Sequence, residues 1–359
     1  MGIAVVLGWR TAAPAAGRHR APRAPAEPLV DSDGDGLPDE WELNGVVVST
    51  PAGPRWIDLP AMGADPQQPD IFLHVDWMAD AAHDQRPDPV ALQLVVDAFA
   101  RSPYRSPTGS VGIALHIDAG PESPLASGRP WGELSRAGAV PWKDNLGTFA
   151  GGSYNWRPFL RVKNRPHGFV ASGRGGVFHY ALFAHYHDRD NPEGTGASGI
   201  SRGIGGTDLL LTLGNFTDGR GTPREQAGTL MHELGHNLGL RHGGCDDADD
   251  KPGYESVMNY AYQMGGLTRD GEADVLDFSR GLALEDEARD GRRPAGGGGS
   301  AGAAKVHSGI AGGPSTTKSG HGNRSPSCAG ISSWDDWRAI RLKVGAIGDL
   351  GAALRGLAH

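Results

Sequence analysis

Cysteine is almost absent from this chain, whose 359 residues include only Cys245 and Cys328. Two thiols exclude the multi-disulfide framework that holds small extracellular domains together, but they permit one bridge. The sequence leaves two alternatives open. The cysteines are unpaired thiols, or one disulfide joins the loop after residue 242 to the C-terminal region of an exported protein. With 38% hydrophobic residues, the chain can form a buried core in either case.

Basic residues are outnumbered, and long apolar runs are missing. Lysine and arginine total 34 against 42 aspartates and glutamates, which gives a formal net charge of -8. Because a general nucleic-acid binder needs an excess of basic groups to neutralise phosphates, we expect no nucleic-acid partner. No run approaches the ~20 apolar residues that a membrane helix needs, so we also expect no membrane span. No pattern indicates the oligomeric state.

Residues 1–30 are predicted to be a leader or a disordered linker outside the fold. The stretch IAVVLGW is a short apolar core, and TAAPAA offers small residues for cleavage. The basic leader of a signal peptide is missing, so the segment can equally be a tail rich in Ala, Pro and Arg.

Composition divides the rest of the chain into four parts. Residues 31–68 hold an acidic loop and an N-terminal arm, and residues 69–290 hold the regular elements of a main domain. Residues 291–327, which include AGGGGSAGAA, are predicted to be a flexible Gly-rich segment. Residues 328–359 regain aromatic and aliphatic side chains, so we expect this C-terminal segment to pack on the main domain.

The order of elements in the main domain predicts the fold class. DIFLHVDW (residues 70–77) and SVGIALHID (110–118) predict strands, and DPVALQLVVDAFARS (88–102) between them predicts a helix. GVFHYALFAHYHD (176–188) and TDLLLTLGNF (207–216) predict further strands. This order indicates an α+β domain with a mixed sheet and a helix packed on it.

A second helix is predicted for TPREQAGTLMHELGHNLGL (residues 222–240). Thr222 can cap it, Pro223 fits its first turn, and Glu225 completes a capping box. His232 and His236 are four residues apart, so their imidazoles project from one face of the helix. That spacing suits two ligands of one zinc ion.

The residues around these two histidines complete a catalytic zinc pattern, H-E-x-x-H-x-x-G-x-x-H. Gly239 allows the left-handed turn that ends a helix, so His242 can return to the metal as third ligand. Glu233 adjoins the first ligand, where it can act as general base on a zinc-bound water. A plain helix with surface histidines is the alternative, and the third histidine and the glycine at these offsets disfavour it.

The stretches HELGHNLGLRH and SVMNY together resemble the metzincin clan of zinc endopeptidases. The resemblance implies that Met258 lies beneath the three imidazoles and that Tyr260 lies near the metal, where it can stabilise the oxyanion. For both residues, simple packing is the alternative. No cysteine precedes the zinc helix in this sequence, so we do not expect the cysteine-based latency of some metzincins.

The same resemblance implies a fold and an activity. The fold would be a metzincin-like mixed, mostly parallel twisted sheet with an antiparallel edge strand, an active-site helix and a loop-rich C-terminal subdomain. TDLLLTLGNF would be the edge strand that pairs with an extended substrate, and the alternative is an interior strand. The expected function is hydrolysis of protein or peptide substrates. A calcium-stabilised extracellular binding or adhesion module with a structural zinc site, and a zinc hydrolase of non-peptide amides, are the alternatives.

A second motif, DSDGDGLPDEWE, has the spacing of a calcium-binding loop. Acidic residues that can supply oxygen ligands occupy alternate positions at its start, Gly36 stands where such a loop makes its sharp turn, and the motif ends with a glutamate. The expected calcium ligands are Asp31, Asp33, Asp35, the backbone carbonyl of Leu37, Asp39 and Glu42. A solvated acidic turn is the alternative. Such loops fill where calcium is plentiful, so the motif favours a secreted, extracellular protein.

Two weaker metal candidates also occur. His179, His185 and His187 share parity on one predicted strand, although exposed or core histidines are the simpler interpretation. The run CDDADD (residues 245–250) follows the third zinc ligand and is more typical of a solvated loop than of a calcium site.

Overall fold

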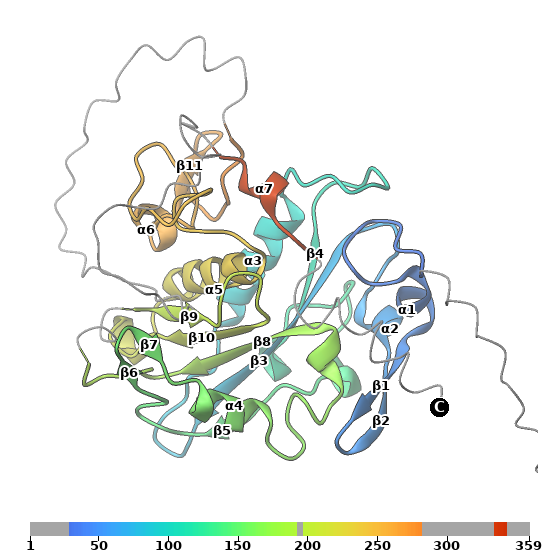
Figure 1. Cartoon of the computed structure of the whole chain (residues 1–359), viewed down its shortest axis with the longest axis horizontal. Coiled ribbons are helices and arrows are strands. Elements are labelled where there is room, and N and C mark those ends of the chain that lie inside the picture. Colours follow the sequence, from blue (N-terminus) through green and yellow to red (C-terminus); the bar gives the residue numbers. More distant parts are fainter. Residues whose placement is uncertain (1–28, 192–196, 282–333, 343–359) are drawn as a thin grey trace, which may run out of the picture.

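The computed structural model describes residues 29–191, 197–281 and 334–342 (Figure 1). Its central sheet has the strand order β4-β3-β8-β10-β9, and β5 also pairs with β3. The strands are β3 (Asp70–Ala79), β4 (Ala114–Asp118), β5 (Ala139–Pro141), β8 (Phe178–Ala184), β9 (Gly199–Ser201) and β10 (Asp208–Thr212). All pairings in this sheet are parallel except β9 with β10. The expected α+β class with a mostly parallel sheet is therefore confirmed.

The strand predicted from TDLLLTLGNF is not the edge strand, and that expectation was wrong. It forms β10, which lies between β8 and β9 and runs parallel to β8. All its residues are buried, as a continuous apolar run requires when both faces of a strand are covered. The antiparallel edge strand is β9, which sequence patterns did not predict because it has only three residues.

Side chains on the two faces of the sheet enter two different cores. Along β3, Leu73 and Val75 face a core that also contains the apolar residues of α3 (Pro89–Ala100) and α5 (Pro223–Asn237). Phe72 and Met78 face the opposite core, which contains Phe159 of α4 (Arg157–Lys163). Figure 1 shows α3 and α5 together on one side of the sheet, with α4 on the other. This alternation is the period-two pattern of a strand covered on both faces.

Both long helices begin where the sequence predicts. The Asp88 carboxylate accepts a hydrogen bond from the backbone N–H of Val90 at the start of α3. At the start of α5, Thr222 and Glu225 form a reciprocal capping box. These caps satisfy N–H groups that the helix itself cannot.

Smaller elements surround this body. They are α1 (Asp39–Asn44), β1 (Val46–Thr50), β2 (Gly53–Ile57), α2 (Leu59–Met62), β6 (Phe149–Ala150), β7 (Ser153–Tyr154), α6 (Tyr260–Gln263), β11 (Leu267–Arg269), β12 (Glu272–Val275) and α7 (Asp336–Ala339). Among the described residues, no helix is long and apolar enough to cross a membrane.

The described part of the C-terminal segment lies against the main domain. The Trp337 ring of α7 is buried, 5.4 Å from the Phe99 ring and 4.9 Å from the Phe278 ring. Cys245 is disulfide-bonded, while Cys328 lies outside the described residues. Residues 1–28 of the predicted leader and all of the Gly-rich segment 291–327 also lie outside them.

Candidate functional site

The three histidines of the zinc pattern converge in the structure. His232 and His236 lie on consecutive turns of α5 with their ring centroids 4.7 Å apart. His242 comes from the loop after the helix, and its Nε2 is 3.1 Å from His236 Nε2. One ring nitrogen from each residue lies within 4.8 Å of the others. All three side chains are buried.

Backbone carbonyls fix the orientation of the two helical imidazoles. His232 Nδ1 donates to the Val257 carbonyl at 2.8 Å, and His236 Nδ1 donates to the Leu240 carbonyl at 3.0 Å. These bonds leave each Nε2 without its proton, and a deprotonated nitrogen is what a metal requires. Burial lowers the pKa of His232 well below its usual value and that of His236 to about 3. Both rings are therefore neutral at physiological pH.

The end of α5 brings His242 back toward the helix. Gly239 has φ of 98°, the left-handed conformation that favours glycine. Its N–H bonds to the His236 carbonyl at 3.0 Å, and the Leu240 N–H bonds to the Gly235 carbonyl at 2.9 Å. This pair of bonds is a Schellman motif, which reverses the chain after a helix. The predicted role of Gly239 thus has a direct structural basis.

Asp249 orients His242 from the other side, since its Oδ1 is 3.1 Å from His242 Nδ1. A carboxylate on the remote nitrogen of an imidazole fixes its tautomer and raises its strength as a metal ligand. Sequence reasoning did not assign this role to Asp249. The signal was the acidic run CDDADD directly after the third histidine.

Glu233 is fully buried beside the histidines. Burial raises the pKa of its carboxyl well above the usual value, and the backbone N–H of Ser201 opposes this rise only in part. Neither carboxylate oxygen accepts a hydrogen bond from a described side chain. A buried carboxylate without a side-chain partner is costly, so its burial indicates a reactive or ligand-binding role over a structural one.

Met258 and Tyr260 also lie at the histidine cluster. Met258 is buried against α5, where its sulfur fills the space that a side chain on Gly235 would need. The Tyr260 hydroxyl is 3.0 Å from His242 Nε2, and its ring is nearly parallel to that of His232 at 5.5 Å. The methionine therefore packs beneath the helix, and the tyrosine places a polar hydroxyl beside the metal-binding nitrogens.

The donor set fits a zinc ion. Zinc prefers nitrogen and sulfur donors, and a catalytic zinc site has three protein ligands and an open position. In the described part of the chain, no fourth His, Cys, Asp or Glu joins the three imidazoles.

The acidic loop forms a second cluster about the start of β3. Oxygens of Asp31, Asp33 and Asp35 lie within 4.8 Å of one another, and so do oxygens of Asp35, Glu42 and Asp70. Asp70 was missed by sequence reasoning, because it lies 28 residues beyond Glu42 and only the fold brings it to the loop.

The contacts of two further expected calcium ligands, Leu37 and Asp39, differ in what they imply, because only those of Asp39 occupy the oxygens that were expected to bind the metal. The Leu37 N–H donates to Asp35 Oδ1 at 2.6 Å, and its side chain is buried. Asp39 joins neither group of oxygens. Its carboxylate accepts hydrogen bonds from the backbone N–H of Ser32 at 2.8 Å and from the Ser32 hydroxyl at 2.7 Å.

Among the described residues, none forms an ion pair with Asp33, Asp35 or Glu42 of this cluster, while Asp70 contacts His116. Burial raises the pKa of Asp33 to about 6, of Asp35 to about 8 and of Glu42 to about 10. Both Glu42 oxygens and Asp33 Oδ2 are buried without a hydrogen-bond donor among the described residues. Oxygen-rich, negatively charged and buried, the cluster suits a hard divalent cation such as calcium.

The three histidines on and after β8 do not form a metal site in the described structure. His179 Nδ1 lies 3.4 Å from the Asn237 amide, His185 Nδ1 lies 3.0 Å from the Gln85 amide, and His187 Nδ1 lies 2.7 Å from the Thr212 hydroxyl. Each ring thus has its own polar neighbour, as the simpler interpretation predicted.

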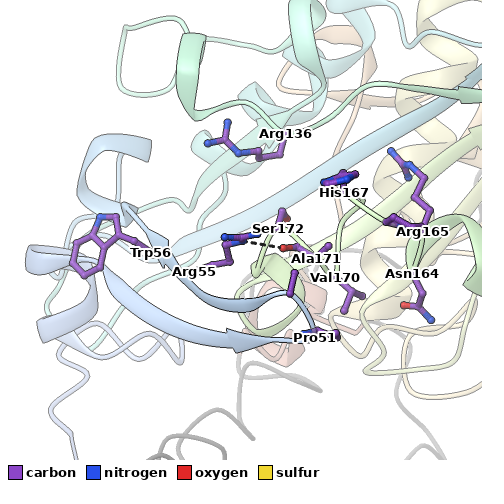
Figure 2. Close-up of a pocket in the computed structure, with 12 residues that line it drawn as sticks. Pro51, Arg55, Trp56, Arg136, Asn164, Arg165, His167, Val170, Ala171 and Ser172 are labelled. Carbon is purple, nitrogen blue, oxygen red and sulfur yellow. Dashed lines mark hydrogen bonds between the residues drawn. The ribbon is translucent and has the colours of Figure 1, made fainter.

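A separate pocket of about 880 Å³ lies between the β1–β2 hairpin and residues 164–172 (Figure 2). Arg55, Arg136 and Arg165 are among its lining residues, and Arg55 Nε donates to the Ala171 carbonyl at 3.4 Å. Arg165 is held by the buried Asp76 at 2.8 Å. Neither the zinc-motif histidines nor the acidic-loop carboxylates line this pocket, so its volume does not identify the reaction site.

Comparison with known proteins identified no relative of this chain. No model of a known protein family matches the chain, and no curated protein matches it in sequence.

Proposed function

We propose that this chain is a secreted zinc-dependent endopeptidase of metzincin type. The observation that carries the proposal is the convergence of His232, His236 and His242, together with the buried carboxylate of Glu233, which follows His232 on the same helix and has no side-chain hydrogen-bond partner among the described residues. An isolated cluster of histidines would not need a carboxylate held in this position. A carboxylate suits the hydrolysis of an amide, because a proton must leave the attacking water and reach the departing amine.

In this proposal the three imidazoles hold the metal, with His232 and His236 oriented by backbone carbonyls and His242 by Asp249. When bound, zinc would lower the pKa of a coordinated water and polarise the scissile carbonyl.

Glu233 would accept the proton of the attacking water and pass it to the leaving nitrogen. The Tyr260 hydroxyl would donate a hydrogen bond to the oxyanion that develops on the substrate carbonyl.

The edge strand β9 supports the choice of a peptide substrate. It is the last strand of the described sheet, and Gly199 in it lies against Glu233. A substrate backbone that pairs with this edge would pass next to the general base. In this proposal β9 takes the substrate-pairing role that the sequence analysis expected of residues 207–216.

Export is part of the proposal. Disulfides persist in oxidising compartments, and Cys245 is disulfide-bonded. The acidic loop also supports export, because loops of this kind bind calcium at the concentrations found outside the cell.

The test compares casein hydrolysis by the wild-type chain and by Glu233→Ala, with zinc and calcium present. We expect a loss of at least about 100-fold in the variant, with unchanged zinc content by atomic absorption. Glu133→Gln, which alters an exposed glutamate, is the matched control and should retain activity. Equal cleavage by wild type and Glu233→Ala would refute the mechanism. Bound zinc with no cleavage of casein or of a peptide library would favour the binding module or a non-peptide amidase.

A further inference from the structure

Four carboxylates are gathered and buried where the N-terminal loop meets the central sheet. Asp33, Asp35, Glu42 and Asp70 are each at most 4% exposed. Among the described residues, no lysine or arginine forms an ion pair with any of them, and His116 is the one basic side chain in contact with Asp70. Like charges this close, away from water, require a cation or protons to compensate them.

Glu42 provides an independent sign of a ligand. Its side chain is 1% exposed, and one of its oxygens lies within 4.8 Å of oxygens of Asp35 and Asp70. Neither oxygen accepts a hydrogen bond from a described donor. Oxygens on opposite sides of a calcium ion, each 2.3–2.6 Å from it, are separated by about 5 Å, so this spacing fits a shared ion.

Asp70 comes from outside the loop and is well fixed. Its Oδ1 accepts a hydrogen bond from His116, a residue of β4, and its Oδ2 accepts one from the Asp65 N–H at 2.8 Å. The Asp70 N–H in turn donates to Asp35 Oδ2 at 2.8 Å. A carboxylate has about four acceptor positions, so these bonds leave Asp70 capacity for a metal.

We infer that Asp70 is a ligand of the loop's calcium ion, together with Asp35 and Glu42. The ion thereby joins the N-terminal loop to the first strand of the central sheet. Asp39, whose carboxylate is engaged by Ser32, contributes little to the binding. The cation is a link between two parts of the fold that are separated along the chain by the β1–β2 hairpin and α2, and this role is independent of whether the chain cleaves peptides.

The test is calcium titration of the full-length chain after removal of calcium with a chelator and restoration of zinc. Isothermal titration calorimetry gives the affinity, and terbium(III) luminescence sensitised by Trp41, the neighbour of Glu42, is a second probe of the same site. We expect Asp70→Asn and Glu42→Gln each to weaken calcium binding at least about tenfold. Asp39→Asn, the matched control, should change it by less than about threefold.

A further variant separates metal ligation from hydrogen bonding. His116→Ala removes the hydrogen bond to Asp70 but leaves the carboxylate, so it should retain most of the calcium affinity. Wild-type affinity in Asp70→Asn together with loss in Glu42→Gln would overturn the inference, and so would a wild-type chain that binds no calcium at millimolar concentration.

Hydrogen exchange of the wild-type chain decides the question if Asp70→Asn does not fold. Calcium should slow exchange of the Asp65 and Asp70 amides, which donate to the carboxylates of Asp70 and Asp35. Protection confined to residues 31–44 would show that the loop binds the ion without Asp70.

Discussion

Gly199 of the edge strand lies directly against Glu233 of the zinc helix. A β-carbon built on Gly199 would be 2.8 Å from both Cγ and Oε1 of Glu233, closer than side chains pack. The absence of a side chain at this position is therefore what lets the edge strand pack so closely against the proposed general base.

Substituting Gly199 tests this relationship. Gly199→Ala should displace the Glu233 carboxylate and lower kcat for casein or peptide hydrolysis by about 100-fold, while zinc content is unchanged. Gly138→Ala is the control, because the space around that glycine is open. Full activity in Gly199→Ala would mean that Glu233 need not occupy its observed position.

Tyr260 should act in the transition state and not in metal binding. Tyr260→Phe removes a hydroxyl 3.0 Å from His242 Nε2 and should lower kcat by about 100-fold with little change in KM. Zinc affinity, measured by competition with a chelator, should stay within about threefold of wild type. Tyr262→Phe alters a tyrosine of the same short helix and should be neutral. A large loss of zinc with little loss of kcat would assign Tyr260 to the metal site.

Met258 should contribute mainly to stability. Because its side chain fills the space over Gly235, Met258→Ala would leave a cavity beneath the zinc helix and lower the free energy of unfolding by about 2–5 kcal/mol. Met258→Leu preserves the volume and should cost less than about 1.5 kcal/mol. Urea unfolding at saturating zinc gives both values, and Met264→Ala, at a partly exposed methionine, is the control. Similar stability of Met258→Ala and wild type would contradict this packing role.

Asp336 should make stability depend on pH. Burial raises its pKa to about 7, while the Tyr254 and Ser256 hydroxyls and the Ser279 N–H donate to its carboxylate. Because the folded state binds this proton more tightly than the unfolded state, stability should decrease as pH rises from about 4 to 7 and then level off. The carboxyl's contribution to that decrease is at most about 4 kcal/mol.

Asp336→Asn removes the titration and keeps an acceptor oxygen. Its free energy of unfolding should match wild type near pH 4 and exceed it at pH 8, as measured by urea unfolding at both values. Asp97→Asn, at a partly exposed carboxylate, should follow the wild-type pH profile. A variant whose pH profile is the same as that of the wild type would show that Asp336 is ionised throughout this range.

The sequence by itself determined the features that depend on neighbours along the chain. The spacing of His232 and His236 fixes both on one helical face, Thr222 and Glu225 cap the same helix, and Gly239 allows the turn before His242. Hydrogen bonds of these elements form within a few residues, so local patterns predicted them correctly. The calcium loop is local in the same sense, and Asp31, Asp33 and Asp35 do come together.

Only the tertiary structure decided which distant residues meet. Asp70 reaches the acidic loop because β3 begins there, and Gly199 reaches Glu233 because a three-residue strand pairs with β10. The order of β9 and β10 in the sheet could not be read from residues 207–216, because an apolar run is compatible with an edge or an interior position until its partners are known. Strand pairing and burial depend on contacts between residues that are far apart in the sequence, so no local sequence pattern predicts them.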